Sequence, residues 1–135
     1  MLRRSLLLPL LLLAACASDG IQPLKWLEIA TSPYVDEVSS SLTGSLMYEG
    51  GCLIFRDDAS HAHLVPIWPT GSTFNGTAVT FHQPAKAEQR IVVGEEFMME
   101  GRAAEWAQID SEYYDRFRQQ CGSKPFYVSA VRPAN

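Results

Sequence analysis

Short runs of alternating apolar and polar residues, each ended by turn-forming residues, most constrain the fold of this chain. The clearest run covers residues 42–49, where apolar residues or glycine alternate mainly with polar ones, as in a strand with one buried face. Further strands are expected at residues 52–55, 63–68, 77–81, 90–93, 96–99 and 126–131. Strands of this length and spacing are typical of a small β-barrel or sandwich.

Two details of this pattern concern the path of the chain. Gly50-Gly51 follows the first run, and paired glycines indicate either a hairpin turn or a sharp bend in one long strand. Pro66 lies inside the third run. Because proline lacks a backbone donor, we expect that strand to lie at a sheet edge or to contain a bulge.

One helix is expected in the C-terminal half. Trp106, Ile109, Tyr113 and Phe117 recur at steps of three and four, and Gly122 follows as a helix-ending residue. This spacing predicts an amphipathic helix at about residues 110–121, before the last strand. We interpret the aromatic stripe as core packing.

The strands and the helix define one domain at residues 42–135, since a chain of this length supports a single core. Residues 16–41 are expected to form a tether that is partly ordered. Trp26, Leu27, Ile29 and Tyr34 are unusual in a fully solvated linker. We therefore expect part of this tether to fold back onto the domain as a short helical turn.

The N-terminal residues predict a location. Arg3 and Arg4 precede an almost unbroken run of leucines and then Leu13-Ala14-Ala15-Cys16, which is typical of a secretory signal too short to cross a bilayer as a helix. Leu-Ala-Ala-Cys resembles the lipobox of bacterial lipoproteins. The resemblance implies that residues 1–15 are removed and Cys16 is acylated; the alternative is an ordinary signal peptide with an incidental cysteine.

The lipobox resemblance also implies a location for the mature chain. Ala17 follows the cysteine, which by the sorting rule of enterobacterial lipoproteins implies the outer membrane, with the domain at its periplasmic face. The lipid on Cys16 would then be the contact with the membrane. No second apolar run approaches the length of a membrane span.

Charge argues against nucleic acid as a partner. The chain has 11 basic and 15 acidic residues, a formal net charge of −4. Loss of Arg3 and Arg4 with the signal peptide leaves 9 basic and 15 acidic residues, or −6. Binding to phosphates requires a clustered basic surface, and the sequence has none.

With Cys16 assigned to acylation, Cys52 and Cys121 remain. Thiols tend to oxidise outside the cytoplasm, so we expect a disulfide between these two cysteines. A reactive or metal-bound thiol is the alternative, although the chain lacks a Cys-x-x-Cys pattern.

Several short motifs resemble those of a group of small, uncharacterised secreted bacterial domains. They are Gly-x-Leu at 44–46, Gly-Gly-Cys-Leu at 50–53, Ile-Trp-Pro-x-Gly at 67–71, Val-Gly-Glu at 93–95, and the late cysteine. The resemblance covers about residues 42–131. It implies a mainly β domain, a five-stranded OB-like barrel with a disulfide across it, and it implies no catalytic residue.

His61-Ala62-His63, close to Asp57 and Asp58, is the densest set of metal-ligating residue types. Alternate residues of an extended chain point the same way, and imidazole suits zinc or copper. A periplasmic metal-binding protein using His61, His63 and Asp57 is therefore one alternative function. The other interpretation is a solvated turn, and we expect no cofactor.

An enzyme is not expected. Ser39, Ser40 and Ser41 lie in the tether, and there is no Gly-x-Ser-x-Gly elbow. The adjacent acidic pairs Glu95-Glu96 and Asp57-Asp58 could serve glycoside cleavage only if folding set two carboxyl groups at a working separation. A cell-wall hydrolase is therefore the weaker alternative.

Trp68, Pro69 and Gly71 form the strand end at which we expect a ligand contact, because barrel loops often meet ligands there. With this net charge, an envelope protein, a peptide or a glycan fits better than a nucleic acid. The alternative is that Trp68 belongs to the core. The sequence thus predicts a non-catalytic binding or adaptor module.

The lipid anchor gives the first test. Cys16→Ser removes the thiol that would be acylated, so the variant should lose palmitate labelling and remain an unprocessed precursor. Metabolic labelling of both proteins and mass spectrometry of their N-termini measure this. Normal palmitate incorporation by the serine variant would contradict the assignment.

Overall fold

The computed structural model describes residues 21–109 and 111–134. Cys16 and the expected signal peptide at residues 1–15 lie outside this range. The described strands are β1 Ala30–Ser32, β2 Ser40–Glu49, β3 Cys52–Asp57, β4 His63–Pro69, β5 Thr73–Phe74, β6 Ala78–Phe81, β7 Gln89–Val92, β8 Phe97–Ala103 and β9 Lys124–Pro133. A 3₁₀ helix, Trp106–Gln108, and α1, Glu112–Cys121, precede β9. The predicted mainly β fold, with a helix before the last strand, is confirmed.

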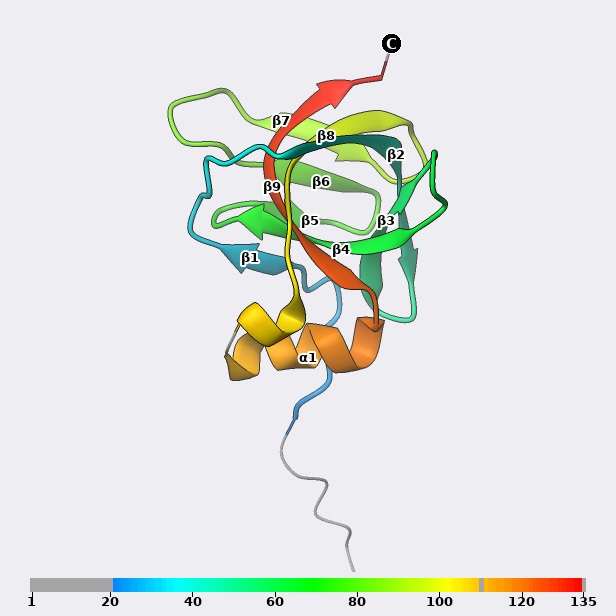
Figure 1. Ribbon diagram of the computed structural model, residues 1–135, viewed down its shortest axis with the longest axis vertical. Coiled ribbons are helices and arrows are strands. Elements are labelled where there is room, and N and C mark those ends of the chain that lie inside the picture. Colours follow the sequence, from blue (N-terminus) through cyan, green and yellow to red (C-terminus); the bar gives the residue numbers. More distant parts are fainter. Residues whose placement is uncertain (1–20, 110, 135) are drawn as a thin grey trace, which may run out of the picture.

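The larger sheet closes on itself. Its strands follow the order β1-β4-β3-β2-β8-β9, and β4 also pairs with β9. The β4–β9 pairing is parallel and joins Leu64 to Lys124 through Ile67 to Tyr127. Strands β4, β3, β2, β8 and β9 therefore form a ring in which each strand has two neighbours (Figure 1).

A second sheet, in the order β5-β6-β7, packs against the ring. The main core is shared between them: Val79, Phe81 and Ile91 of the second sheet lie in one cluster with Phe55 and Phe126 of the ring. The sequence runs at 90–93 and 96–99 therefore belong to different sheets, as β7 and the start of β8.

Two glycines allow the ring strands to approach closely. A Cβ atom at Gly44 would lie 1.9 Å from the carbonyl oxygen of Arg56, and one at Gly101 would lie 1.8 Å from that of Tyr127. The β8–β9 register also shifts between Glu100 and Gly101. Glycine in a strand commonly marks such close backbone approaches and bends.

The turn at Gly50-Gly51 is a hairpin. β2 and β3 are antiparallel, with Glu49 opposite Cys52. Gly50 and Gly51 have φ of 59° and 77°, the conformation of a two-residue type I′ turn, which glycine adopts without steric cost. Of the two alternatives predicted from the sequence, the hairpin is therefore correct and the bend in one long strand is wrong.

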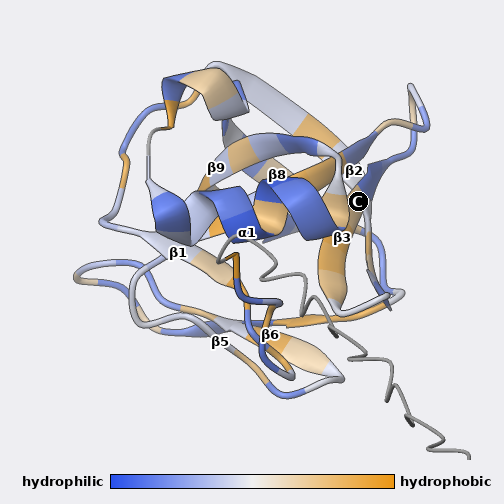
Figure 2. Cartoon of the chain, turned by 90° about the horizontal axis from the view of Figure 1, so that it is seen from below, coloured by the Kyte–Doolittle hydropathy of each residue, from blue (hydrophilic) through white to orange (hydrophobic). Residues whose placement is uncertain are grey.

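Helix α1 is formed and ended by local residues. The hydroxyl of Ser111 accepts the Tyr114 N–H, and Gly122 follows at φ 70° with its N–H donated to the Arg118 carbonyl. The observed helix begins at Glu112, slightly later than the predicted residues 110–121. Its polar side faces outward (Figure 2), while Phe117 is buried.

The helix covers the outer face of β3 and β4. Phe117 and Ile109 pack with Ile54, Val65 and Ile67 in a second cluster, distinct from the core inside the ring. No helix in the described residues is long and apolar enough to cross a membrane.

Part of the segment predicted as a tether packs on the domain. Residues 30–32 form β1, which pairs in parallel with β4 from Ile67 to Pro69, and Ile29 and Ala30 are buried. The segment does fold back onto the domain, but as a strand and not as the expected helical turn. A strand of three residues is too short for its alternation to stand out in the sequence.

Pro66 was expected at an edge or a bulge, and the structure differs. β4 pairs with β9 through this residue, opposite Phe126. On its other side, β4 pairs with β3 at Leu64 and with β1 only from Ile67 onward. Pro66 thus lies in a central strand, at the point where the partner on one side changes.

The disulfide between Cys52 and Cys121 is confirmed, with a Cα–Cα distance of 5.7 Å and a sequence separation of 69. It joins the start of β3 to the last residue of α1. Closing a loop of this length restricts the unfolded chain by roughly 4 kcal/mol on the chain-entropy model.

Loss of the disulfide should therefore destabilise the domain. Cys52→Ala combined with Cys121→Ala should lower the free energy of unfolding by about 2 to 4 kcal/mol, measured by urea titration of the protein without its signal peptide. The wild type under reducing conditions is the matched control and should show a similar loss. Two free thiols in natively folded wild type, detected by non-reducing mass spectrometry, would contradict the pairing.

Candidate functional site

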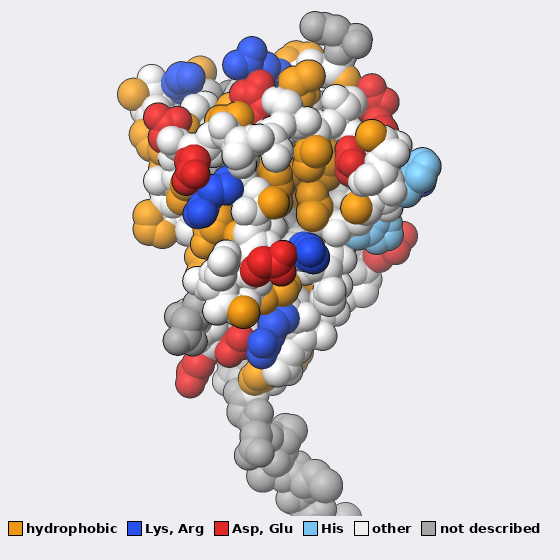
Figure 3. All heavy atoms as spheres, viewed as in Figure 1, with side chains coloured by type: hydrophobic (Ala, Val, Ile, Leu, Met, Phe, Trp, Pro, Cys, Tyr) orange, Lys and Arg blue, Asp and Glu red, His pale blue; other side chains and the backbone are white. Residues whose placement is uncertain are grey.

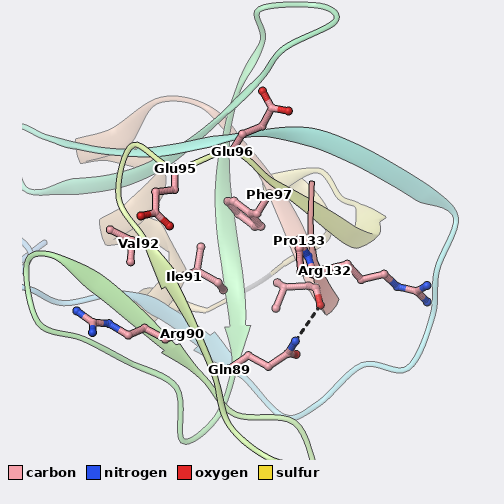
Figure 4. A pocket seen from close by; sticks show the side chains of 10 residues that line it. Gln89, Arg90, Ile91, Val92, Glu95, Glu96, Phe97, Arg132 and Pro133 are labelled. Carbon is pink, nitrogen blue, oxygen red and sulfur yellow. Dashed lines mark hydrogen bonds between the residues drawn. The ribbon is translucent and has the colours of Figure 1, made fainter. Parts of the chain in front are cut away.

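A pocket of about 230 Å³ lies between the second sheet and the last strand of the ring. It is formed by β7, by the turn and first residue of β8, and by the end of β9 (Figure 4). Its lining residues are Gln89, Arg90, Ile91, Val92, Glu95, Glu96, Phe97, Val131, Arg132 and Pro133.

The floor of this pocket is apolar. Ile91, Phe97 and Val131 are 5%, 6% and 5% exposed, and all three belong to the main core cluster. Figure 4 shows Ile91 and Phe97 pointing into the middle of the pocket. The site can therefore bury a small apolar group on a surface that the core holds rigid.

The rim of the pocket is charged with both signs. Arg90 and Arg132 extend away from the pocket on opposite sides (Figure 4). Arg132 Nε lies 3.0 Å from Glu100 Oε1. Within the described residues, Glu95 and Glu96 are exposed and form no ion pair, so their charges remain available to a ligand.

The pocket lies far from the point where the described chain begins. The first part of the described chain, drawn in blue, lies beside α1, at the end of the molecule opposite β7 and the end of β9 (Figure 1). Helix α1 holds this segment: the Arg116 guanidinium donates to both carboxylate oxygens of Glu28 and to the Gln22 carbonyl.

Two tyrosines of α1 extend this attachment to β1. The Tyr113 hydroxyl donates to the Ile29 carbonyl at 3.2 Å, and the Tyr114 hydroxyl donates to the Thr31 carbonyl at 2.8 Å. Burial raises the pKa of Tyr114 above its ordinary value, because the phenolate is poorly solvated there. These groups have a structural role and lie away from the pocket.

The predicted contact at Trp68 requires correction. Trp68 is 0% exposed and packs edge-to-face with Phe81, at 6.1 Å between ring centroids. Pro69 is also buried, and only Gly71 of the three predicted contact residues is exposed. Trp68 points into the ring, so its indole is part of the core and does not reach a ligand from this surface.

The candidate metal ligands are engaged in local contacts. The Asp57 carboxylate accepts hydrogen bonds from the Ser60 N–H at 3.1 Å and from its hydroxyl at 2.5 Å. The bond from the hydroxyl contributes most to lowering the pKa of Asp57 below its ordinary value, since it favours the charged form. His61 Nδ1 lies 2.8 Å from Arg56 Nη2.

His63 is exposed at the start of β4. Among the described residues, no three histidine, cysteine, aspartate or glutamate side chains form a group that could hold a metal ion. The side chains of the turn between β3 and β4 are instead held by the hydrogen bonds from Ser60 to Asp57 and between Arg56 and His61.

None of the binding or metal residues predicted from the sequence lines the pocket. In the sequence, Glu95 and Glu96 stand out only as an acidic pair, and the runs at 90–93 and 126–131 have the pattern of ordinary strands. The floor joins residues from β7, β8 and β9, which are brought together by packing between two sheets. The charged pair directly before an apolar strand is the sole local signal.

Figure 3 shows Lys and Arg side chains dispersed among acidic ones on one face of the molecule. No continuous basic surface is visible there. This view agrees with the excess of acidic residues in the sequence.

A core position for Trp68 predicts the behaviour of two variants. Trp68→Ala should destabilise the domain by about 3 to 5 kcal/mol, because it leaves a large cavity in a packed core. Trp68→Phe is the matched control and should cost much less, since Trp68 Nε1 has no hydrogen-bond partner among the described residues. Thermal and urea unfolding measure both, and a Trp68→Ala protein as stable as wild type would contradict the core assignment.

No protein-family model, curated protein or solved structure matches the chain.

Proposed function

We propose that this protein is an outer-membrane lipoprotein whose domain acts as a non-catalytic binding or adaptor module at the periplasmic face. The pocket between β7 and β9 is the proposed contact, and an envelope protein or peptide is the proposed partner. The observation that carries this proposal is the apolar floor of Ile91, Phe97 and Val131, which opens to the surface between charged side chains.

The dimensions of the pocket support binding of one side chain. Sites for small molecules usually enclose about 300 to 1,000 Å³, whereas this pocket has about 230 Å³. Burial of apolar surface supplies roughly 25 cal/mol per Å², so a single aliphatic or aromatic side chain would gain a modest affinity there. The remaining affinity would come from contacts on the rim.

The position of the pocket supports an adaptor role. If Cys16 carries a lipid, the membrane lies on the side where the chain enters the domain, beside α1. The pocket lies at the opposite end (Figure 1). It would therefore face the periplasm, where soluble or wall-bound partners are accessible.

We further propose that the five-stranded ring is an OB-like barrel. The closed ring and the short strands support this description. OB-folds commonly bind ligands on the face of their second and third strands, which correspond here to β3 and β4. Because α1 covers that outer face, we place the partner at the pocket beside β7, which is open to the surface.

Site-specific photo-crosslinking in the intact envelope tests this function. A photoreactive amino acid at Glu95, on the rim, should give a discrete crosslinked adduct. One at Ala59, exposed on the β3–β4 turn, is the matched control and should give none. Combining the Glu95 probe with Val92→Lys, which places a charge beside the apolar floor, should reduce the adduct severalfold.

Equal adducts from both positions, or an adduct from Glu95 that Val92→Lys leaves unchanged, would overturn the pocket as the contact. Circular dichroism and an intact disulfide must show that the Val92→Lys protein remains folded. If the Val92→Lys protein unfolds, Val92→Thr replaces it, because threonine has nearly the shape of valine and places a hydroxyl group beside the floor. The adduct from the Glu95 probe is then compared with and without Val92→Thr, and it should again decrease.

A further inference from the structure

The strand that forms one wall of the pocket has an open edge. Within the described part of the chain, β7 pairs with β6 alone and ends the second sheet. Open edges expose backbone donors and acceptors that can pair with another strand. The pocket lies directly at this edge, since all four residues of β7 line it.

The register identifies the backbone groups at the open edge. The Val93 N–H donates to the Thr77 carbonyl at 2.8 Å, and antiparallel pairs alternate along a ladder. The backbone groups of Ile91 therefore face β6, as do those of Gln89, whereas those of Arg90 and Val92 face the pocket. The Val92 carbonyl already accepts the Glu95 N–H at 3.1 Å.

Three backbone groups of β7 thus face outward: the N–H and carbonyl of Arg90 and the N–H of Val92. They include both donors and acceptors, at the spacing of a strand. A partner that pairs with all three must itself present alternating donors and acceptors, as an extended peptide backbone does.

The opposite wall of the pocket offers a second set of backbone groups. Within the residues that the structure describes, β9 pairs with β4 only through Tyr127, so its later residues have no neighbouring strand on that side. The Gln89 side-chain amide donates to the Val131 carbonyl across the pocket at 3.3 Å. A side-chain amide thus donates to a carbonyl that could otherwise accept a hydrogen bond from a peptide N–H.

We propose that an extended peptide segment of the partner adds to β7 as a strand, with one apolar side chain on the floor formed by Ile91, Phe97 and Val131. This inference rests on the proposed binding function and names its ligand class. The rim side chains without an ion pair among the described residues are Glu95, Glu96 and Arg90. This acidic excess favours a peptide with basic residues beside the apolar one. A glycan would lack the alternating backbone groups that the β7 edge matches.

The probe is a fluorescent, end-blocked synthetic peptide in which leucine and lysine alternate. Two analogues carry backbone N-methyl groups, one on the odd and one on the even residues, with identical side chains. Because a strand pairs through one edge at a time, one analogue should bind about tenfold or more weakly and the other should match the parent. Fluorescence anisotropy with the folded, disulfide-linked domain measures the three affinities.

Two variants of the protein provide opposite expectations. Gln89→Ala removes the amide that donates to the Val131 carbonyl. The peptide can then donate to this carbonyl, so its affinity should rise by up to about tenfold, which corresponds to one additional hydrogen bond. Val92→Pro removes one of the outward N–H groups and should weaken binding by a similar factor, since proline is tolerated at sheet edges. If Val92→Pro fails to fold, the comparison of the two N-methyl analogues still tests strand addition to β7, because it uses the wild-type protein.

The outcomes separate this inference from the proposed function. Equal binding by both N-methyl analogues would overturn strand addition, while binding lost on Val92→Lys would still support the apolar pocket. Crosslinking at Glu95 without any peptide binding would overturn the peptide as ligand class and leave the adaptor function standing. If the wild type forms a dimer and Val92→Pro makes it monomeric, a second copy of the chain occupies the β7 edge. That result would also overturn strand addition by a partner peptide.

Discussion

The parallel pairing of β4 with β9 is the interaction on which the rest of the structure depends. It joins the last strand to the third strand of the ring and so converts a sheet into a closed ring. Closure also requires Gly44 and Gly101, because any side chain there would overlap a neighbouring carbonyl group. Each ring strand then has a neighbour on both sides for at least part of its length, whereas β1, β5 and β7 each have a strand on one side only among the described residues.

Helix α1 connects this ring to the segment that precedes it. The disulfide fixes the end of α1 to β3, and the side chains of Tyr113, Tyr114 and Arg116 hold the residues before and within β1. Much of the helix is polar on its outer side, so its stability comes from the apolar cluster beneath it and from these attachments. In a lipid-anchored protein this arrangement would fix the orientation of the domain relative to the anchor.

The position of α1 also determines which surface is left for a partner. The outer face of β3 and β4 is covered by Phe117 and Ile109, and Trp68 packs inside the ring. The pocket beside β7 differs from both surfaces, because its floor is buried core and its wall is an unpaired strand edge. An apolar floor next to free backbone groups suits recognition of an extended chain.

Local physical chemistry was readable from the sequence wherever neighbours along the chain decide the structure. Alternation predicted the ring strands, the three- and four-residue spacing predicted α1, and the two cysteines remaining after Cys16 predicted the disulfide. Trp68 was predicted as a ligand contact, and the core was the alternative, because a strand-end indole can face the solvent or the core. The tertiary structure buries it in the main core cluster. The pocket was likewise decided by tertiary structure, since Ile91, Phe97 and Val131 meet only when two sheets pack together, and no local pattern encodes that contact.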